Sequence, residues 1–179
     1  MEGKYLTGAI LANAYRLLRV FPNSDPIMGF VLPAAKNEPF WKAPLFAFAT
    51  MFTFDMLTSG IGAWTWVTST TYALIAFAFT MLLKAEKPGL ATYTKYGLAG
   101  VLAFDFITGP AMGSALFHQP FWLTLLAQIP FTAMHLVSVS FSILIITPFF
   151  DRQAMLDLQG MASSVRNAFL QAVKAWGAQ

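Results

Sequence analysis

The sequence contains no cysteine and few charged residues, and these two shortages exclude several kinds of protein. Without cysteine there are no disulfides, no thiolate chemistry and no Cys-ligated zinc site. Only 11% of the 179 residues are charged, whereas a soluble domain carries about 25%. With 57% apolar residues and a mean hydropathy of +0.60, the chain has too little charge to cover a solvated surface. This composition predicts an integral membrane protein.

Signatures of catalysis, metal binding and nucleic-acid binding are also missing. The chain has two histidines, His118 and His135, and no HExxH or similar metal-ligand spacing. P-loop and GxSxG motifs are absent. The net charge is +3, but no Arg/Lys run gives the basic surface that nucleic acid needs. We therefore expect no enzymatic activity, no metal, no cofactor and no nucleic-acid partner.

Six apolar segments follow one another, separated by loops that contain proline or glycine. They cover residues 5–21, 26–35, 40–58, 64–83, 96–116 and 121–150. Because a transmembrane helix needs about 20 apolar residues, the pattern predicts an all-α bundle of six transmembrane helices over residues 1–150. The second segment rises only about 15 Å as a helix. We expect it to be short or broken and enclosed by protein.

The distribution of lysine and arginine predicts the topology. If all six segments cross and both termini are cytoplasmic, only Arg16 and Arg19 approach the outer side. The other cations then face the cytoplasm, as the positive-inside rule requires. We expect a multi-pass protein of the plasma membrane.

Residues 151–179 form a second, cytoplasmic unit with a different pattern. Apolar residues recur there with helical spacing and predict one amphipathic helix. They are Met155, Leu158, Met161, Ala162, Val165, Phe169, Val173 and Trp176. Two interpretations remain open, a membrane-surface anchor and a docking surface for a partner protein.

A short sequence repeat contains an aspartate at the same position in each copy. Residues 54–60 (FDMLTSG) match residues 104–110 (FDFITGP). The predicted topology places Asp55 and Asp105 at matched depth, in the outer third of two parallel spans. Ionisable residues within spans usually face the bundle interior or a cavity. They either form the floor of an outward-facing binding site or have a structural role, as helix caps or as partners of Thr58 and Thr108.

Further candidate binding residues lie on the fourth and sixth segments. Trp64 and Trp66 can stack on a planar ring, while Tyr72 and nearby hydroxyls bond its edge. The alternative is an interfacial aromatic belt with Ser/Thr contacts between helices. Gln128 and His135 complete the candidate substrate-binding set, although a lone histidine in a helix is more often structural.

The first segment has two notable features. Arg16 and Arg19 can snorkel outward, pair with Asp25 or bind a substrate carboxylate. Gly8, Ala9 and Ala12 form a small-residue face with the spacing of close helix packing. That face meets either another helix of this chain or a partner.

Several stretches together resemble the substrate-binding (S) components of energy-coupling factor (ECF) transporters, particularly small prokaryotic members. The resemblance rests on residues 19–29 (RVFPNSDPIMG), 54–66, 104–110 and 128–132 (QIPFT) and on the His135-Leu136 pair. It implies a six-helix bundle that binds a vitamin or similar micronutrient from the outer side. Uptake then requires a coupling membrane subunit and two ATPase subunits. In that family, small alanines on the first span contact the coupling subunit. The matching positions here are Gly8, Ala9 and Ala12, with Gly8 in place of an alanine.

A different function remains open beside uptake. In this alternative the chain is a non-transporting membrane scaffold, its aspartates are structural, and the C-terminal helix recruits a partner. A concave, polar cavity at the outer end distinguishes the two, since a scaffold would have tightly packed outer loops.

Overall fold

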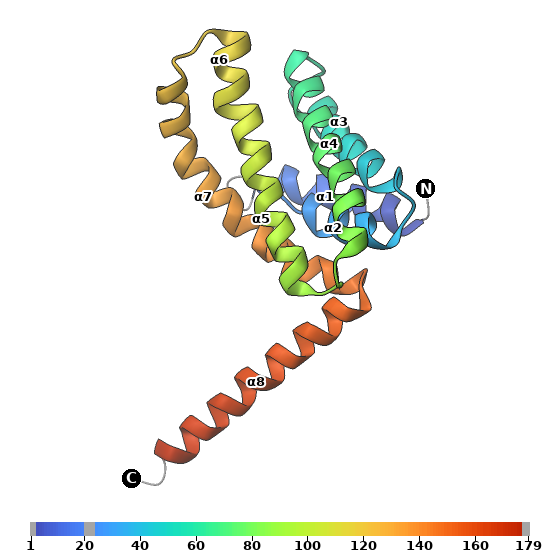
Figure 1. The fold of residues 1–179 in the computed structure, drawn as a ribbon, viewed down its shortest axis with the longest axis vertical. Coiled ribbons are helices and arrows are strands. Elements are labelled where there is room, and N and C mark those ends of the chain that lie inside the picture. The colour runs from blue at the N-terminus through green and yellow to red at the C-terminus, as the bar shows by residue number, and fades with distance from the viewer. Residues whose placement is uncertain (1–2, 20–23, 177–179) are drawn as a thin grey trace.

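The computed structural model describes residues 3–19 and 24–176, and within these ranges the regular structure is entirely helical (Figure 1). Residues 20–23, which belong to the motif at 19–29, lie outside the described part. The elements are α1 (Gly3–Leu18), α2 (Ile27–Asn37), α3 (Lys42–Leu57), α4 (Ala63–Ala85), α5 (Leu90–Phe106), a π-helical turn (Ile107–Ala111), α6 (Met112–Phe117), α7 (Phe121–Ile146), a 3-10 turn (Thr147–Phe149) and α8 (Arg152–Trp176).

Three of these helices are long and apolar enough to cross a membrane. The first is α4, Ala63–Ala85, with 23 residues. The second, Leu90–Phe117, has 28 residues and joins α5, the π-helical turn and α6. The third, Phe121–Phe149, has 29 residues and joins α7 and the 3-10 turn. The expected all-helical fold is therefore confirmed. The first and third apolar segments form helices of 16 residues each, and the second forms one of 11. A bundle in which all six segments cross stays a prediction.

The short helix α2 lies in the core of the bundle. Every residue from Ile27 to Ala35 is buried, and neighbours on α3, α4 and α7 surround the helix. At Gly29 the approach to α7 is so close that a Cβ would lie 2.7 Å from the backbone oxygen of Ser142. Enclosure by protein explains how a helix of only about 16 Å fits within a membrane protein, since the unpaired backbone groups at its buried start are shielded from lipid.

The polarity of the bundle is the reverse of that of a soluble protein. Large apolar side chains are exposed along α7, for example Trp122, Leu126 and Phe141. Polar and ionisable side chains are buried instead, among them Asp25, Asp105 and His135. Exposed apolar surface of this extent marks contact with membrane or protein.

Helix termini gather at two ends of the bundle. One end, which we call the cationic end, contains Lys4, Lys36 and Lys42. Glu38 forms ion pairs there with Lys4 and Lys42, both at 2.7 Å. There Lys36 also donates to the backbone oxygen of Leu83 at 2.8 Å and so caps the end of α4. At the opposite, aromatic end, Trp64 contacts Phe117 with ring centroids 5.7 Å apart.

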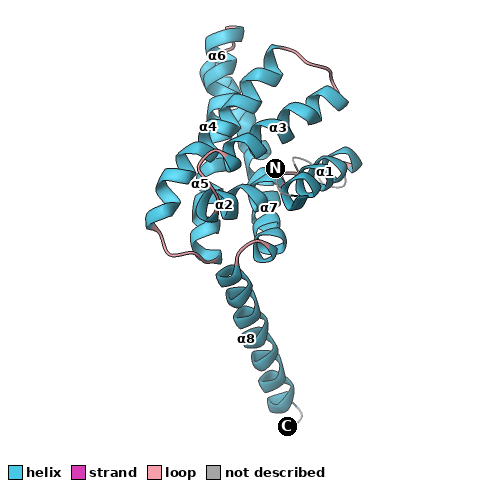
Figure 2. Ribbon diagram, turned by 90° about the vertical axis from the view of Figure 1, so that its right-hand side faces the viewer, coloured by secondary structure: helices cyan, strands magenta, loops and turns pink. Residues whose placement is uncertain are grey.

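Helix α8 leaves the bundle beside the cationic end and projects away from it (Figure 2). Asp151 caps its start, accepting from the backbone N–H of Ala154 at 2.9 Å. Burial opposes ionisation of Asp151, but donors on Asn37, Ala154 and Tyr93 hold the pKa of this carboxyl below its usual value. The predicted amphipathic helix is confirmed, and its apolar stripe is uncovered, with Val165, Phe169 and Trp176 exposed.

Candidate functional site

The N-terminus of α2 carries a buried aspartate at the centre of a polar network. One carboxylate oxygen of Asp25 accepts from the backbone N–H of Ile27 at 2.8 Å, which satisfies a free donor of the first helical turn. The other oxygen accepts from the Tyr72 hydroxyl and lies 3.3 Å from Nε2 of His135. The backbone N–H of Asp25 donates to Oγ of Ser138 at 2.8 Å. Asp25 thus joins α2 to α4 and α7.

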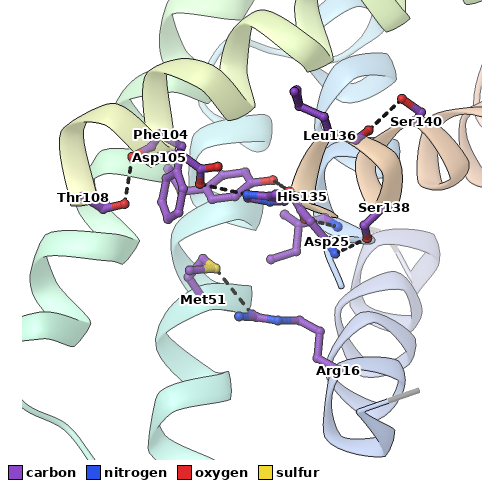
Figure 3. A network of polar contacts seen from close by, with 12 residues as sticks. Arg16, Asp25, Met51, Phe104, Asp105, Thr108, His135, Leu136, Ser138 and Ser140 are labelled. Atoms are coloured by element: carbon purple, nitrogen blue, oxygen red, sulfur yellow. Dashed lines mark hydrogen bonds and ion pairs between the residues drawn. The ribbon is translucent and has the colours of Figure 1, made fainter. Parts of the chain in front are cut away.

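His135 links this aspartate to a second one (Figure 3). Its Nδ1 lies 2.9 Å from Oδ1 of Asp105, so the imidazole stands between two buried carboxylates. A doubly protonated ring donates from both nitrogens, which is the arrangement that satisfies both acids. The second oxygen of Asp105 is buried and has no hydrogen-bond partner in the described part of the chain.

Tyr72, Asp105 and His135 lie near the middle of the three long helices that supply them. His135 is fourteen residues from either end of Phe121–Phe149. Since a helix rises about 1.5 Å per residue, the network is far from both ends of the bundle. Ionisable groups at such depth are costly in a membrane and are kept where they serve a function or satisfy one another.

Aromatic rings separate the network from a cavity. Phe104 packs on Tyr72 with centroids 5.2 Å apart and on the imidazole of His135 at 6.2 Å. Phe131 contacts the same imidazole at 6.1 Å. Both phenylalanines also line the cavity, so they form a wall common to the two.

The cavity has a volume of about 740 Å³ and extends to the aromatic end of the bundle. Its lining combines aromatic rings with polar side chains, a composition typical of small-molecule sites. The lining residues are Arg16, Met51, Asp55, Trp64, Thr68, Phe104, Thr108, Gly109, Gly113, Phe117, Gln119, Thr124, Ala127, Gln128 and Phe131.

Two charged residues line this cavity. Arg16 reaches from α1 toward Met51 (Figure 3), with Nη1 3.4 Å from the Met51 sulfur. Its guanidinium also lies 3.8 Å from the centroid of the Phe54 ring. Asp55 is half-buried, and none of the hydrogen bonds or ion pairs among the described residues involves its carboxylate.

The structure divides the seven predicted binding residues into three groups. Asp55, Trp64 and Gln128 line the cavity, and Tyr72, Asp105 and His135 belong to the buried network. Trp66 lies in neither place. It packs on Phe52 and Phe48 at 5.2 and 6.1 Å and is 53% exposed, because a residue two positions after Trp64 on a helix faces another side.

The expectation of matched depth for the two repeat aspartates is wrong. Asp55 lies two residues before the end of α3, whereas the helix that carries Asp105 continues to Phe117. The second motif forms a π-helical turn at Ile107–Ala111, so the chain does not leave the bundle there. Asp105 is therefore deep in the bundle and Asp55 is near the aromatic end.

The sequence suggested Asp25 only as a partner of Arg16 or Arg19, whereas the structure places it in the middle of the bundle, beside Tyr72 and His135. The missed signal was the length of the second segment. A helix of about 16 Å that ends at the cationic end must begin deep in the bundle. Asp25, which precedes it directly, shares that depth.

The small-residue face of α1 packs against another helix of this chain, which is the first of the two alternatives left open for it. Gly8 and Ala12 are buried, and Ala9 is partly buried. A Cβ on Gly8 would lie 2.8 Å from the Phe30 ring of α2. The small residues thus permit close packing of α1 on α2.

The described residues contain no group of three or more His, Cys, Asp or Glu side chains placed to hold a metal ion. Comparison with protein-family models, curated proteins and solved structures found no match.

Proposed function

We propose that this protein is a membrane subunit that binds a small solute and serves its uptake, as an S component of an ECF-type transporter does. The cavity of about 740 Å³ with Arg16, Asp55 and Gln128 in its wall carries the proposal. A volume of this size lies in the range of small-molecule sites. The ligand class we favour is a vitamin or similar micronutrient.

Asp55 further favours a binding function over a purely structural one. Asp55 faces the cavity without a hydrogen-bond partner among the described residues. Aspartates that acted only as helix caps would have their oxygens occupied by backbone N–H groups.

The proposed membrane arrangement has six spans and cytoplasmic termini in the plasma membrane. Lysines cluster at the cationic end, where α1 and α3 begin and α2 and α4 end, and this end would face the cytoplasm. The cavity would then open outward. Uptake would require a coupling membrane subunit and two ATPases, because the sequence has no P-loop.

Ligand binding can be tested by native mass spectrometry of protein purified in mild detergent. We expect a co-purified small molecule. Ala127 lines the cavity, so Ala127→Trp should fill it and remove the ligand. Leu126→Trp, at an exposed neighbour outside the lining, should retain it. Absence of any bound solute, or its retention in Ala127→Trp, would refute the proposal.

The topology has a separate test that exploits the absence of native cysteine. Ile61→Cys and Glu86→Cys place thiols in the loops after α3 and after α4. A membrane-impermeant maleimide should label them from opposite sides of the membrane. Labelling from the same side contradicts the six-span arrangement.

A second candidate function is that of an interaction scaffold, and one observation favours it. The apolar stripe of α8 is exposed over most of its length, so it is available to a membrane surface or a partner. Deletion of residues 159–179 separates the two candidates. Ligand retention after deletion is expected for a binding subunit.

A further inference from the structure

We propose that Arg16 binds an anionic group, a carboxylate or a phosphate, of the solute that occupies the cavity. The inference rests on the proposed function and narrows its substrate class. It starts from an arginine in the cavity wall whose guanidinium forms no ion pair with a carboxylate among the described residues.

The contacts of Arg16 leave most of its binding capacity unused. A guanidinium has five N–H donors in a planar fork. One of them faces the Met51 sulfur at 3.4 Å, and a thioether is a weak acceptor. The ring of Phe54 contacts the guanidinium as a cation–π partner. Neither contact uses the bidentate geometry for which the guanidinium fork is suited.

The carboxylates of the described chain do not fill this role. Asp25 and Asp105 are held by His135, and Glu38 is held by lysines at the cationic end. Asp25 and Asp55 act on Arg16 only through longer-range attraction, since no ion pair joins either of them to it. Arg16 is half-buried. A partly buried cation without a close anion is unfavourable, and an anionic ligand would remove that cost.

The rest of the lining describes the other parts of the ligand. Trp64, Phe104, Phe117 and Phe131 provide aromatic surface, which suits a planar or apolar body. Asp55 can accept a hydrogen bond from an amino group or ring N–H of the ligand. The geometry points to a compound with a planar body, one anionic group and one donor.

Two pairs of probes test the anionic group on the intact protein. Each pair differs only in a carboxylate replaced by its amide: 4-aminobenzoate with 4-aminobenzamide, and tryptophan with tryptophanamide. Affinities are measured by calorimetry on protein in phosphatidylcholine nanodiscs. We expect at least one acid to bind about 10- to 100-fold more tightly than its amide, as for a charge-assisted hydrogen bond.

Variants then assign that difference to Arg16. Arg16→Gln should reduce the acid-to-amide ratio to about twofold or less, and Arg16→Lys should restore part of it because charge remains but the fork is lost. Arg19→Gln is the matched control, since Arg19 is exposed and outside the cavity lining. It should leave the ratio unchanged.

Several results overturn the inference. They are equal binding of acid and amide by the wild type, failure of both pairs to bind, and an unchanged ratio in Arg16→Gln. The acid-to-amide affinity ratio of the wild type still tests the inference if a variant fails to fold. A co-purified solute without an acidic group would leave the proposed function intact and remove the role of Arg16.

A lipid headgroup carries the same chemistry as a soluble phosphate. Nanodiscs with added phosphatidylglycerol distinguish these sources. We expect the acid probe to bind equally well with and without this lipid. Loss of probe binding in its presence assigns the anion to a lipid and overturns the role of the solute.

Discussion

Residues 54–60 and 104–110 are two copies of one sequence pattern in different surroundings. In both, the threonine four residues after the phenylalanine donates to the phenylalanine backbone oxygen at 2.8 Å. The local conformation before the two threonines is therefore alike. Yet Asp55 faces a cavity and Asp105 is buried against His135. The comparison shows that a repeated motif fixes local geometry but not depth.

The last residue of each motif decides the difference. Gly60 takes a left-handed conformation with φ +81°, and its N–H donates to the backbone oxygen of Asp55 at 2.8 Å. This is a common way for a helix to end. In the second copy, Pro110 lies within a π-helical turn and the helix continues through α6. An irregular turn of this kind relieves the clash of a proline ring with the preceding turn.

The largest predicted effect separates the two aspartates. Asp105→Ala leaves His135 without its closest partner, and breaking a buried pair of this kind costs about 3–5 kcal/mol. Asp55→Ala removes a half-exposed carboxylate without hydrogen bonds and should cost less than about 0.5 kcal/mol. The free energy of unfolding in mild detergent measures both. Equal losses would mean that the two motifs share an environment after all.

The next effect concerns the glycine that ends α3. Gly60→Ala should destabilise the protein by about 1–2 kcal/mol, since an L-residue is strained at positive φ. A Cβ there would meet no atom within 4 Å, so the cost is conformational only. Gly60→Asn is the control and should lose less, because asparagine tolerates this conformation. Equal losses in the two variants would contradict this cause.

A third carboxylate tests whether partners or burial decide the energy. Glu38 accepts from Lys4 and Lys42, which outweigh its partial burial and, with Tyr5, lower its pKa to about 2. Because its folded pKa lies below the unfolded value, its stabilisation is complete above about pH 4.5 and lost as pH falls toward 2.

Glu38 remains in contact with water, so we expect this effect to be only about 1 kcal/mol. Wild type should lose that much more stability than Glu38→Gln between pH 5 and pH 2, measured by thermal unfolding. Added salt should reduce the difference. A loss as large as that of Asp105→Ala would show that the number of partners matters more than burial.

Much of the fold could be predicted from the sequence because it depends on local patterns. The apolar segments, with glycine or proline at their boundaries, predicted every long helix of the bundle. The helical spacing of apolar residues predicted the amphipathic α8. The depth of Asp105 could not be predicted, since the match to residues 54–60 suggested that both aspartates lie at the same depth, whereas the second helix continues through a π-helical turn. Arg16 was recognised as a candidate, but its lack of an acidic partner is a tertiary fact.

The smallest predicted effect returns to the contact that the two copies share. Thr58→Val and Thr108→Val each remove a hydroxyl that donates to a backbone oxygen within its own helix. Such bonds contribute little to helix stability. Moreover, the Phe104 oxygen still accepts from the N–H of Ile107 when the Thr108 hydroxyl is removed. We therefore expect each variant to lose less than about 0.5 kcal/mol, although Thr108 is buried and Thr58 is exposed.

Equal small losses, measured beside the two aspartate variants, would separate local from tertiary contributions within one motif. The stability losses of the threonine variants would then reflect the local geometry that both motifs share. Those of the aspartate variants would reflect the different surroundings of the two motifs. A loss above about 1 kcal/mol for Thr108→Val alone would contradict this division. Since Thr108 also lines the cavity, such a loss would mean that its hydroxyl orders the wall between the cavity and the buried network.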